Sequence, residues 1–350
     1  MLIDATLTKS IADTGPVAAA LEAAGYDGVW VGETSHEPFL QLLVAAGATD
    51  RVTLGTAVAI AFARTPMTMA GAAYDLAAYS QGRFVLGLGS QVKPHIERRF
   101  SMPWSHPAPR MREFVLALRA IWAAWHEGAP LDFRGEFYTH TLMTPFFSPP
   151  AHAYGPPPVY LAGVGALMTE VAGEVCDGFF FHPFTTERYL REVTVPALER
   201  GRARSGRTLE GFAVAGPAFT CTGRDEAELA AAIRGTRDQI AFYASTPAYR
   251  PVLELHGWGE LQPELTRLSK LGRWSEMGDA IDDELLHAFA VVGEPRAVGT
   301  ALAARWGATA TRLSLYATYP SDPSVWPDVL DGLRPARPCC LLYTSDAADE

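Results

Sequence analysis

The sequence predicts a (β/α)8 barrel with two insertions. Short buried strand patterns alternate with amphipathic helix patterns along most of the 350 residues, and eight such strands can be recognised. Parallel strands joined by helical crossovers are the arrangement that this alternation favours. Apolar residues make up 48% of the chain and charged residues 19%, so a large core can form. An open, doubly wound sheet is the alternative, and no linker marks a second domain.

The first half of the chain contains four strand–helix pairs in succession. Helices are expected to open at Thr and Pro signals and to close at glycine. The expected strands are residues 2–7, 28–32, 52–60 and 84–88. The expected helices run from Thr14 to Gly25, over 36–48, from Thr65-Pro66 to the turn at 80–82, and over 110–125. The last helix is amphipathic and places its large apolar side chains on one face.

The second half repeats this alternation around the insertions. Residues 131–158, with FRGEFY and two proline-rich runs, are expected to form a hairpin and loop after the fourth strand. Residues 243–292 are expected to form a mostly helical insertion after the seventh strand. The other strands are expected at 159–162, 178–181, 211–221 and 311–316, with the last long helix at 294–306. One domain thus covers residues 1–336, and the end at 337–350, CLLYTSDAADE included, is interpreted as a non-native disordered tail.

Composition argues against several classes of function. The net charge is −10, which disfavours a nucleic-acid binder because phosphate neutralisation requires clustered Lys and Arg. No run of about 18 apolar residues predicts a membrane span, and no signal-peptide pattern is recognised, so a cytoplasmic location is expected. The four cysteines form no CxxC pair and HExxH is absent, so no metal site is expected. The expected partner is a small-molecule substrate.

The ends of the predicted strands hold the candidate functional residues, because a barrel places its chemistry there. The third strand, LGTAVAIAFARTP, has mostly small side chains near its end. Small residues in a strand indicate that another backbone segment or a flat ligand lies close to it. Glycine turns in GLGSQV and LAGVGALMTE, after the fourth and fifth strands, leave N–H groups free at helix starts. These turns favour a phosphate-bearing ligand, and the alternative is a tight turn that simply requires glycine.

Polar and aromatic residues follow other strands. Glu33 either caps the next helix or moves a proton, and His36 is either a solvated first-turn residue or a proton carrier, since histidine titrates near neutral pH. Phe62 and Phe181 are among several aromatic residues near the strand ends and indicate an apolar or aromatic substrate. His182, after the sixth strand, is assigned to the same substrate pocket.

Five segments in order resemble the luciferase-like monooxygenase superfamily, and more narrowly its branch that uses the deazaflavin coenzyme F420. They are GYDGVWVGE, VTLGTAVAIAFARTPMTMA, SQGRFVLGLGS, PPPVYLAGVGALMTEVAGEVCDGFFFHP and TRLSLY, and the resemblance covers about residues 1–330. It implies a (β/α)8 barrel whose third strand carries a bulge with a non-prolyl cis peptide, here Ala57-Val58, behind the deazaflavin ring. It also implies that the coenzyme phosphate lies near the loops after the fourth and fifth strands.

The resemblance assigns the site residue by residue. The implied coenzyme contacts are Thr34, Ala57, Val58, Gly89, Ser90, Gln91, His95, Ala162, Gly163, Val164 and Gly165. The implied proton carrier is His36 or Glu33. The family pattern has an acidic residue followed directly by His, whereas Thr34 follows Glu33 here and the His comes at 36. Val92 stands where some relatives have a glutamate.

The sequence therefore predicts a coenzyme F420-dependent oxidoreductase that transfers hydride between carbon 5 of the deazaflavin and a small apolar or aromatic substrate. The alternatives are an FMN-dependent luciferase-like monooxygenase and a non-catalytic deazaflavin-binding protein. Family analogy favours a homodimer. Replacing His36 with alanine is expected to cut turnover while coenzyme affinity stays within a few-fold.

Overall fold

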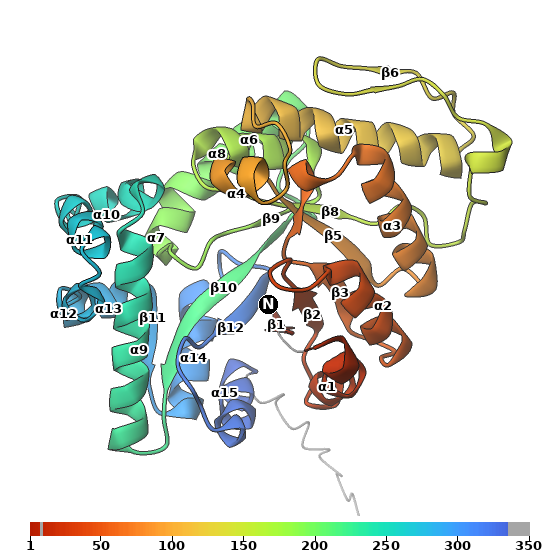
Figure 1. The fold of residues 1–350 in the computed structure, drawn as a ribbon. Helices are drawn as coiled ribbons and strands as arrows, with labels where there is room; N and C mark the ends of the chain where they lie inside the picture. Colours follow the sequence, from red (N-terminus) through yellow and green to blue (C-terminus); the bar gives the residue numbers. More distant parts are fainter. Residues whose placement is uncertain (8–9, 335–350) are drawn as a thin grey trace, which may run out of the picture.

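Eight parallel strands close into a barrel in the computed structural model, which describes residues 1–7 and 10–334 (Figure 1). The strands are β1 (Leu2–Thr6), β2 (Gly28–Val31), β3 (Thr53–Thr56), β5 (Phe84–Gly89), β8 (Val159–Ala162), β9 (Gly178–Phe180), β10 (Ala213–Thr222) and β12 (Arg312–Tyr316). Their order is β10-β12-β1-β2-β3-β5-β8-β9, and the β9–β10 pairing closes the ring. The predicted barrel is confirmed, and the doubly wound sheet is excluded.

Helices surround this barrel and cover its outer face (Figure 1). Those between the barrel strands include α1 (Ile11–Ala23), α2 (Pro38–Gly47), α3 (Pro66–Tyr79), α5 (Pro107–His126), α6 (Ala166–Val175), α8 (Val195–Arg204), α9 (Glu226–Ala244) and α14 (Pro295–Trp306). Local signals explain their starts: the Thr65 hydroxyl accepts the Thr68 N–H at 3.2 Å, and Asp225 accepts the Glu228 N–H at 2.8 Å. Within the described residues, no helix combines the length and apolar character that crossing a membrane requires.

Several element boundaries differ from the sequence prediction. The first helix begins at Ile11 rather than Thr14, because Ser10 is its N-cap and the Thr14 hydroxyl bonds back to the Ser10 carbonyl at 3.0 Å. The strand predicted at 52–60 is interrupted after Thr56 and resumes as β4 (Ala59–Ile60), which pairs with β5. Three short elements were not predicted: α4 (Lys93–Arg98), β11 (Ala290–Gly293) and α15 (Trp326–Leu333).

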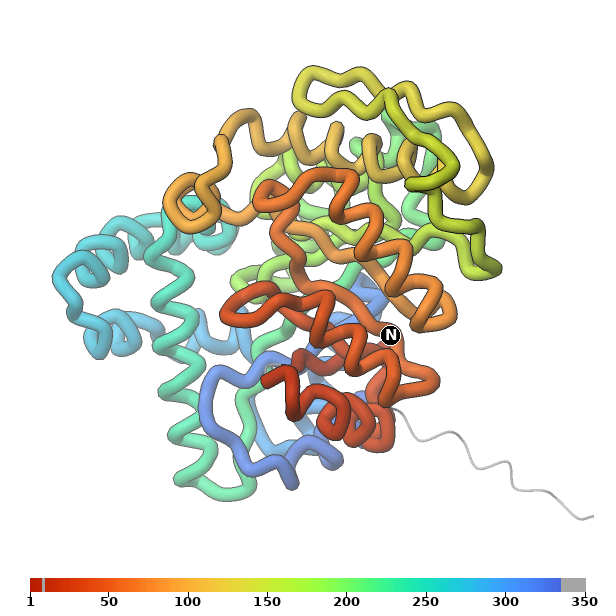
Figure 2. Tube along the Cα trace, turned by 45° about the vertical axis from the view of Figure 1, so that its right-hand side comes forward, coloured from red at the N-terminus to blue at the C-terminus, as the bar shows by residue number. Residues whose placement is uncertain are grey.

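Both insertions have the predicted secondary structure. The first contains the hairpin β6 (Phe133–Arg134) and β7 (Thr139–His140), which lies beside α5 in Figure 1. The second contains a 3₁₀ turn at Pro247–Tyr249, then α10 (Arg250–Leu255), α11 (Leu261–Lys270), α12 (Trp274–Asp279) and α13 (Asp283–Phe289). In Figures 1 and 2 these helices gather at one side of the barrel, away from α1, α2 and α3. The predicted tail at 337–350 lies outside the described residues.

The second insertion has its own hydrophobic cluster beside the barrel. The cluster includes Ile240, Leu253, Leu265, Met277, Leu286 and Phe289, all buried. Phe184 and Phe219, which come from the barrel side, belong to the same cluster, and the Phe184 and Phe289 rings stack at 4.4 Å. Pairing of β11 with the far end of β10 adds backbone hydrogen bonds to this junction. The insertion is therefore packed against the barrel rather than tethered by a linker.

An ion pair is buried where β1 and β12 meet. Arg312 donates two hydrogen bonds to the Asp4 carboxylate, at 2.7 and 2.9 Å, and the two side chains are 8% and 1% exposed. The guanidinium also lies 5.4 Å from the centre of the Trp30 ring. Burial raises the pKa of the Asp4 carboxyl, and the Arg312 charge opposes that rise. This pair joins the first and last barrel strands beneath the cavity described next.

Candidate functional site

A cavity of about 890 Å³ opens at the carboxyl ends of the barrel strands. Its walls come from the segments that follow β3, β5, β8 and β9, from residues within β10 and from the start of the second insertion. Asp4, Trp30 and Ser314 lie at the strand positions that line it more deeply. The location agrees with the rule that barrel enzymes build their sites at this face.

One wall of the cavity is formed by the interruption in the third barrel strand. The Ala57-Val58 peptide bond is cis, as the resemblance implies, and Ala57 is exposed toward the space that it lines. Gly89 lies directly behind, since a Cβ there would be 2.5 Å from Val58 Cγ2. Ala57, Val58 and Gly89 thus form an apolar wall with little side-chain volume, which we call the flat wall. Gly55 is small for another reason, because the Trp30 ring occupies the space of its absent side chain.

The glycine turns form the adjoining wall. Gly89, Ser90, Gln91, Ala162, Gly163, Val164 and Gly165 all line the cavity, as the sequence predicts. Gly165 is the N-cap of α6, with φ of +85°, and has no side chain to cap the first N–H groups of that helix. The helix start also carries partial positive charge. Lys93, at the start of α4, lines the same mouth and adds a cation.

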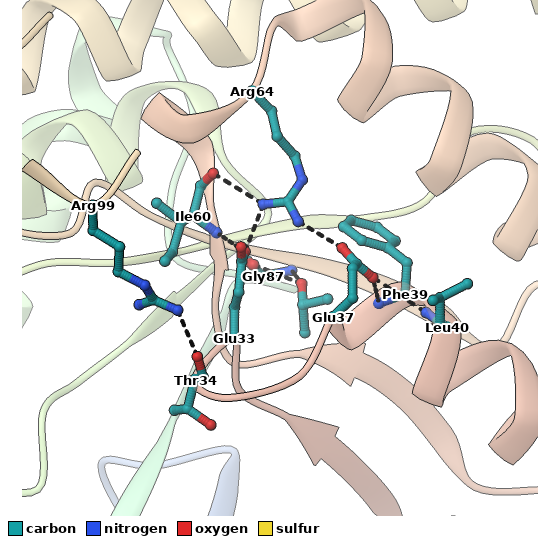
Figure 3. Close-up of polar contacts among 10 residues, drawn as sticks. Glu33, Thr34, Glu37, Phe39, Leu40, Ile60, Arg64, Gly87 and Arg99 are labelled. Atoms are coloured by element: carbon teal, nitrogen blue, oxygen red, sulfur yellow. Dashed lines mark hydrogen bonds and ion pairs between the residues drawn. The ribbon is translucent and has the colours of Figure 1, made fainter. Parts of the chain in front are cut away.

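Glu33 is held in a network outside the residues that line the cavity (Figure 3). Its carboxylate accepts the Ile60 N–H at 2.8 Å and pairs with Arg64 at 2.6 Å, and its side chain is 8% exposed. Arg64 also pairs with Glu37 at 2.6 Å. The cap of α2 is Glu37, which accepts the Phe39 N–H, so Glu33 does not cap that helix. Glu33 and Arg64 therefore fix the strand interruption from behind.

We expect the substitution Arg64→Met to lower the free energy of unfolding by about 2 kcal/mol, because Glu33 stays largely buried and loses its charged partner. Urea unfolding followed by circular dichroism measures this loss. Arg98→Met is the matched control, because Arg98 lies on the exposed surface of α4. Equal losses in the two variants would show that the network does not support the fold.

His36, Thr34 and His95 are exposed and are not among the residues that line the cavity. The backbone carbonyl of Thr34 accepts a hydrogen bond from Arg99 at 2.7 Å, which ties this loop to α4 (Figure 3). The structure thus brings most of the contacts predicted after the third, fourth and fifth strands to the cavity, but neither His95 nor the residues of the loop after the second strand. The proton-transfer roles of His36 and Glu33 stay predictions, and the turnover of the His36→Ala variant tests the first of them.

Two of the three predicted pocket residues line the cavity. Phe181 does so, and its ring stacks on Trp306 at 5.4 Å. His182 does so too. Phe62 does not, because it is fully buried behind Trp104, whose ring meets it edge-on at 5.7 Å. Trp104 supplies the aromatic surface at that position instead.

The sequence analysis missed a tyrosine that faces His182. Tyr249 lies at the end of the 3₁₀ turn that opens the second insertion, and it lines the cavity. Its hydroxyl lies 3.0 Å from His182 Nε2, and the two rings stack with centres 4.5 Å apart. Burial lowers the pKa of His182 to about 4 and raises the pKa of Tyr249 to about 12, so both are neutral near pH 7. The only sequence signal was the aromatic content of the insertion.

The residues present fit a planar, partly anionic ligand. Ala57 is exposed in the flat wall, where a larger side chain would fill cavity space, and Gly89 makes room for the Val58 side chain. The start of α6 with Lys93 favours negative charge nearby. The described residues that line the cavity carry two charged side chains, Lys93 and Asp4, and Asp4 is paired with Arg312. The arrangement therefore suits a flat aromatic group with a phosphate-bearing tail.

Comparison with known proteins places this fold and site in a family. The model of the luciferase-like monooxygenase family matches residues 3–312. An uncharacterised protein of Mycobacterium tuberculosis (strain ATCC 25618 / H37Rv) is 58% identical over 300 residues, which cover 86% of this chain and 88% of that protein. The F420-dependent glucose-6-phosphate dehydrogenase of Beutenbergia cavernae is 32% identical over 202 residues, 54% of this chain and 57% of that protein.

Among solved structures, the coenzyme F420-dependent tetrahydromethanopterin reductase of Methanopyrus kandleri has the same fold. The two structures match with a TM-score of 0.76 at 20% sequence identity, and the match covers 95% of this chain and 97% of the reductase chain. The family match begins within β1, ends at Arg312, the first residue of β12, and includes both walls of the cavity. The chain belongs to the luciferase-like monooxygenase family.

Proposed function

We propose that this protein is an oxidoreductase that binds the deazaflavin coenzyme F420 and transfers hydride between carbon 5 of the coenzyme and a small apolar or aromatic substrate. The observation that carries the proposal is the flat wall at Ala57, Val58 and Gly89, which adjoins the open start of α6 in one cavity. Relatives and solved structures whose names include coenzyme F420 support the same assignment.

Each part of the cavity has a role in this proposal. Ala57, Val58 and Gly89 would hold the plane of the ring, and the first N–H groups of α6 with Lys93 would bind the phosphate. Trp104 and Phe181 would exclude water from the space above the ring. When bound, the coenzyme supplies or accepts the hydride, and the protein positions the two reactants.

A titration of the purified protein with the deazaflavin coenzyme and with FMN, side by side, tests this proposal. We expect the fluorescence of the deazaflavin to change at micromolar concentration or below, on the order of −8 kcal/mol in binding free energy. Preference for FMN would instead support the alternative function, a flavin-dependent monooxygenase. Oxygen consumption separates these two, because a deazaflavin reacts poorly with oxygen.

The non-catalytic alternative and the oligomeric state are tested by separate experiments. A non-catalytic binding protein would bind the deazaflavin tightly and reduce no substrate in an anaerobic screen. The homodimer is proposed from family analogy, and light scattering of the purified protein measures it. Light scattering gives the oligomeric state whichever compound is the substrate, whereas the anaerobic screen requires that the substrate be among the compounds tested.

A further inference from the structure

Another part of the cavity lining is aromatic and carries two side chains that are joined by a hydrogen bond. His182 follows β9, and Tyr249 opens the second insertion, so the pair joins two parts of the chain that are 67 residues apart. Tyr243 meets the His182 ring edge-on at 4.7 Å, and Phe184 packs against Tyr249. The pair is therefore held by aromatic neighbours on both sides.

The hydrogen bonds of His182 determine where its proton lies. Its Nδ1 accepts the backbone N–H of Phe184 at 3.0 Å, so Nδ1 carries no hydrogen. Because the imidazole is neutral, the hydrogen is on Nε2, and Nε2 donates to the Tyr249 oxygen. The hydroxyl hydrogen of Tyr249 is therefore not shared with His182. Because Tyr249 lines the cavity, this hydrogen can be donated to a bound group there. The pair thus presents an O–H donor to the cavity.

The surroundings of this donor select for a neutral acceptor. Among the described residues that line the cavity, the charged side chains are Lys93, at the mouth, and Asp4, which is paired with Arg312. A carboxylate next to Tyr249 would lose hydration, and Lys93, in the segment after β5, is the single lysine or arginine among the described residues that line the cavity. A carbonyl oxygen needs only one or two donors, and the aromatic walls suit an apolar remainder.

We infer that His182 and Tyr249 form the subsite that recognises the oxygen of a neutral carbonyl compound, with Tyr249 donating the hydrogen bond and His182 positioning its hydroxyl. The inference deepens the proposed function, and it rests on that function only in calling the bound compound the substrate. The second insertion then contributes a binding residue to the barrel site, because its packed cluster fixes the turn that carries Tyr249.

Calorimetric titration of the protein alone tests the subsite with three probes of similar shape. They are acetophenone, its hydrocarbon analogue α-methylstyrene, in which CH₂ replaces the oxygen, and benzoate. We expect acetophenone to bind about tenfold more tightly than α-methylstyrene, the size of one hydrogen bond in an apolar pocket. Benzoate is expected to bind more weakly than acetophenone. Equal binding of the ketone and the hydrocarbon, stronger binding of benzoate, or no detectable ketone binding would overturn the inference.

Variants locate the effect at the pair. In Tyr249→Phe the preference for the ketone should vanish, while affinity for α-methylstyrene stays within about twofold, because only the hydroxyl is removed. Tyr243→Phe is the control in the same aromatic cluster, since its hydroxyl bonds to Tyr316 at 2.8 Å and Tyr243 is not a cavity-lining residue. It should keep the preference. A preference retained in Tyr249→Phe would contradict the assignment.

The positioning role of His182 has its own readout. His182→Phe should reduce the ketone preference severalfold, and His182→Gln, whose side-chain amide can donate to Tyr249, should recover part of it. Equal preferences in both variants and the unaltered protein would assign no positioning role to His182. The coenzyme titration distinguishes the two levels of inference: failure to bind the deazaflavin removes the proposed function, whereas loss of the ketone preference removes only the subsite.

Discussion

Replacing Ala57 with leucine is expected to weaken binding of the deazaflavin coenzyme by about 100-fold, or about 2.7 kcal/mol. Ala57 is exposed in the cavity, at the strand interruption that forms the flat wall. A leucine there would occupy the space of a ring lying on that wall. Because the side chain would point into the open cavity, it should not disturb the packing of the protein without ligand. Coenzyme fluorescence during titration measures the affinity, and thermal unfolding checks that the fold is unchanged.

Ala23→Leu is the matched control for this experiment, because Ala23 is an exposed residue at the end of α1, outside the cavity. We expect its coenzyme affinity to equal that of the unaltered protein. If Ala57→Leu also binds normally, the ring does not lie against this wall, and the proposed orientation of the coenzyme is wrong. If both variants lose affinity together with stability, the fold rather than the wall is responsible.

Replacing Arg312 with methionine is expected to lower the free energy of unfolding by about 3–5 kcal/mol, because the Asp4 carboxylate then stays buried without its partner. Urea unfolding at neutral pH measures this loss. The double variant Asp4→Asn/Arg312→Met carries no charge at either of these two positions, and most of the stability should return. An equal loss in the single and double variants would assign the effect to packing around Trp30 instead.

The pH dependence of the Arg312→Met variant follows from the same pair. Burial already raises the pKa of Asp4 in the folded protein, and removing the guanidinium removes the influence that opposes this rise. A group whose pKa is higher in the folded state is stabilising when protonated, so stability lost at neutral pH should partly return in mildly acidic buffer. A loss independent of pH would show that Asp4 is not its source.

The barrel was predictable because its signals are local and repeated. The period of the apolar residues, the helix caps and the glycine turns place the strands and helices to within a few residues. The strand ends then identify the residues of both cavity walls, from Ala57 to Gly165. Boundaries failed where a nearby side chain competed for the cap, as Ser10 does with Thr14. The split of the third strand appeared in the sequence only as a run of small residues.

The missed contacts depend on long-range packing. Nothing near Phe62 in the sequence shows that Trp104 lies between it and the cavity, and Arg64 reaches back across 31 residues to Glu33. His182 and Tyr249 are separated by 67 residues and five further elements of structure. Pairs of this kind are set by how helices dock on the barrel, and a single sequence carries no local pattern for them.

The packed second insertion has a consequence for how this protein can diversify. The flat wall and the glycine turns lie between residues 57 and 165, whereas Tyr249 and most of its supporting cluster belong to the second insertion. Selection can therefore remodel residues 247–289 without disturbing the wall that we propose for the coenzyme. Exchanging this insertion among relatives should change which compounds are accepted while the coenzyme requirement is inherited intact.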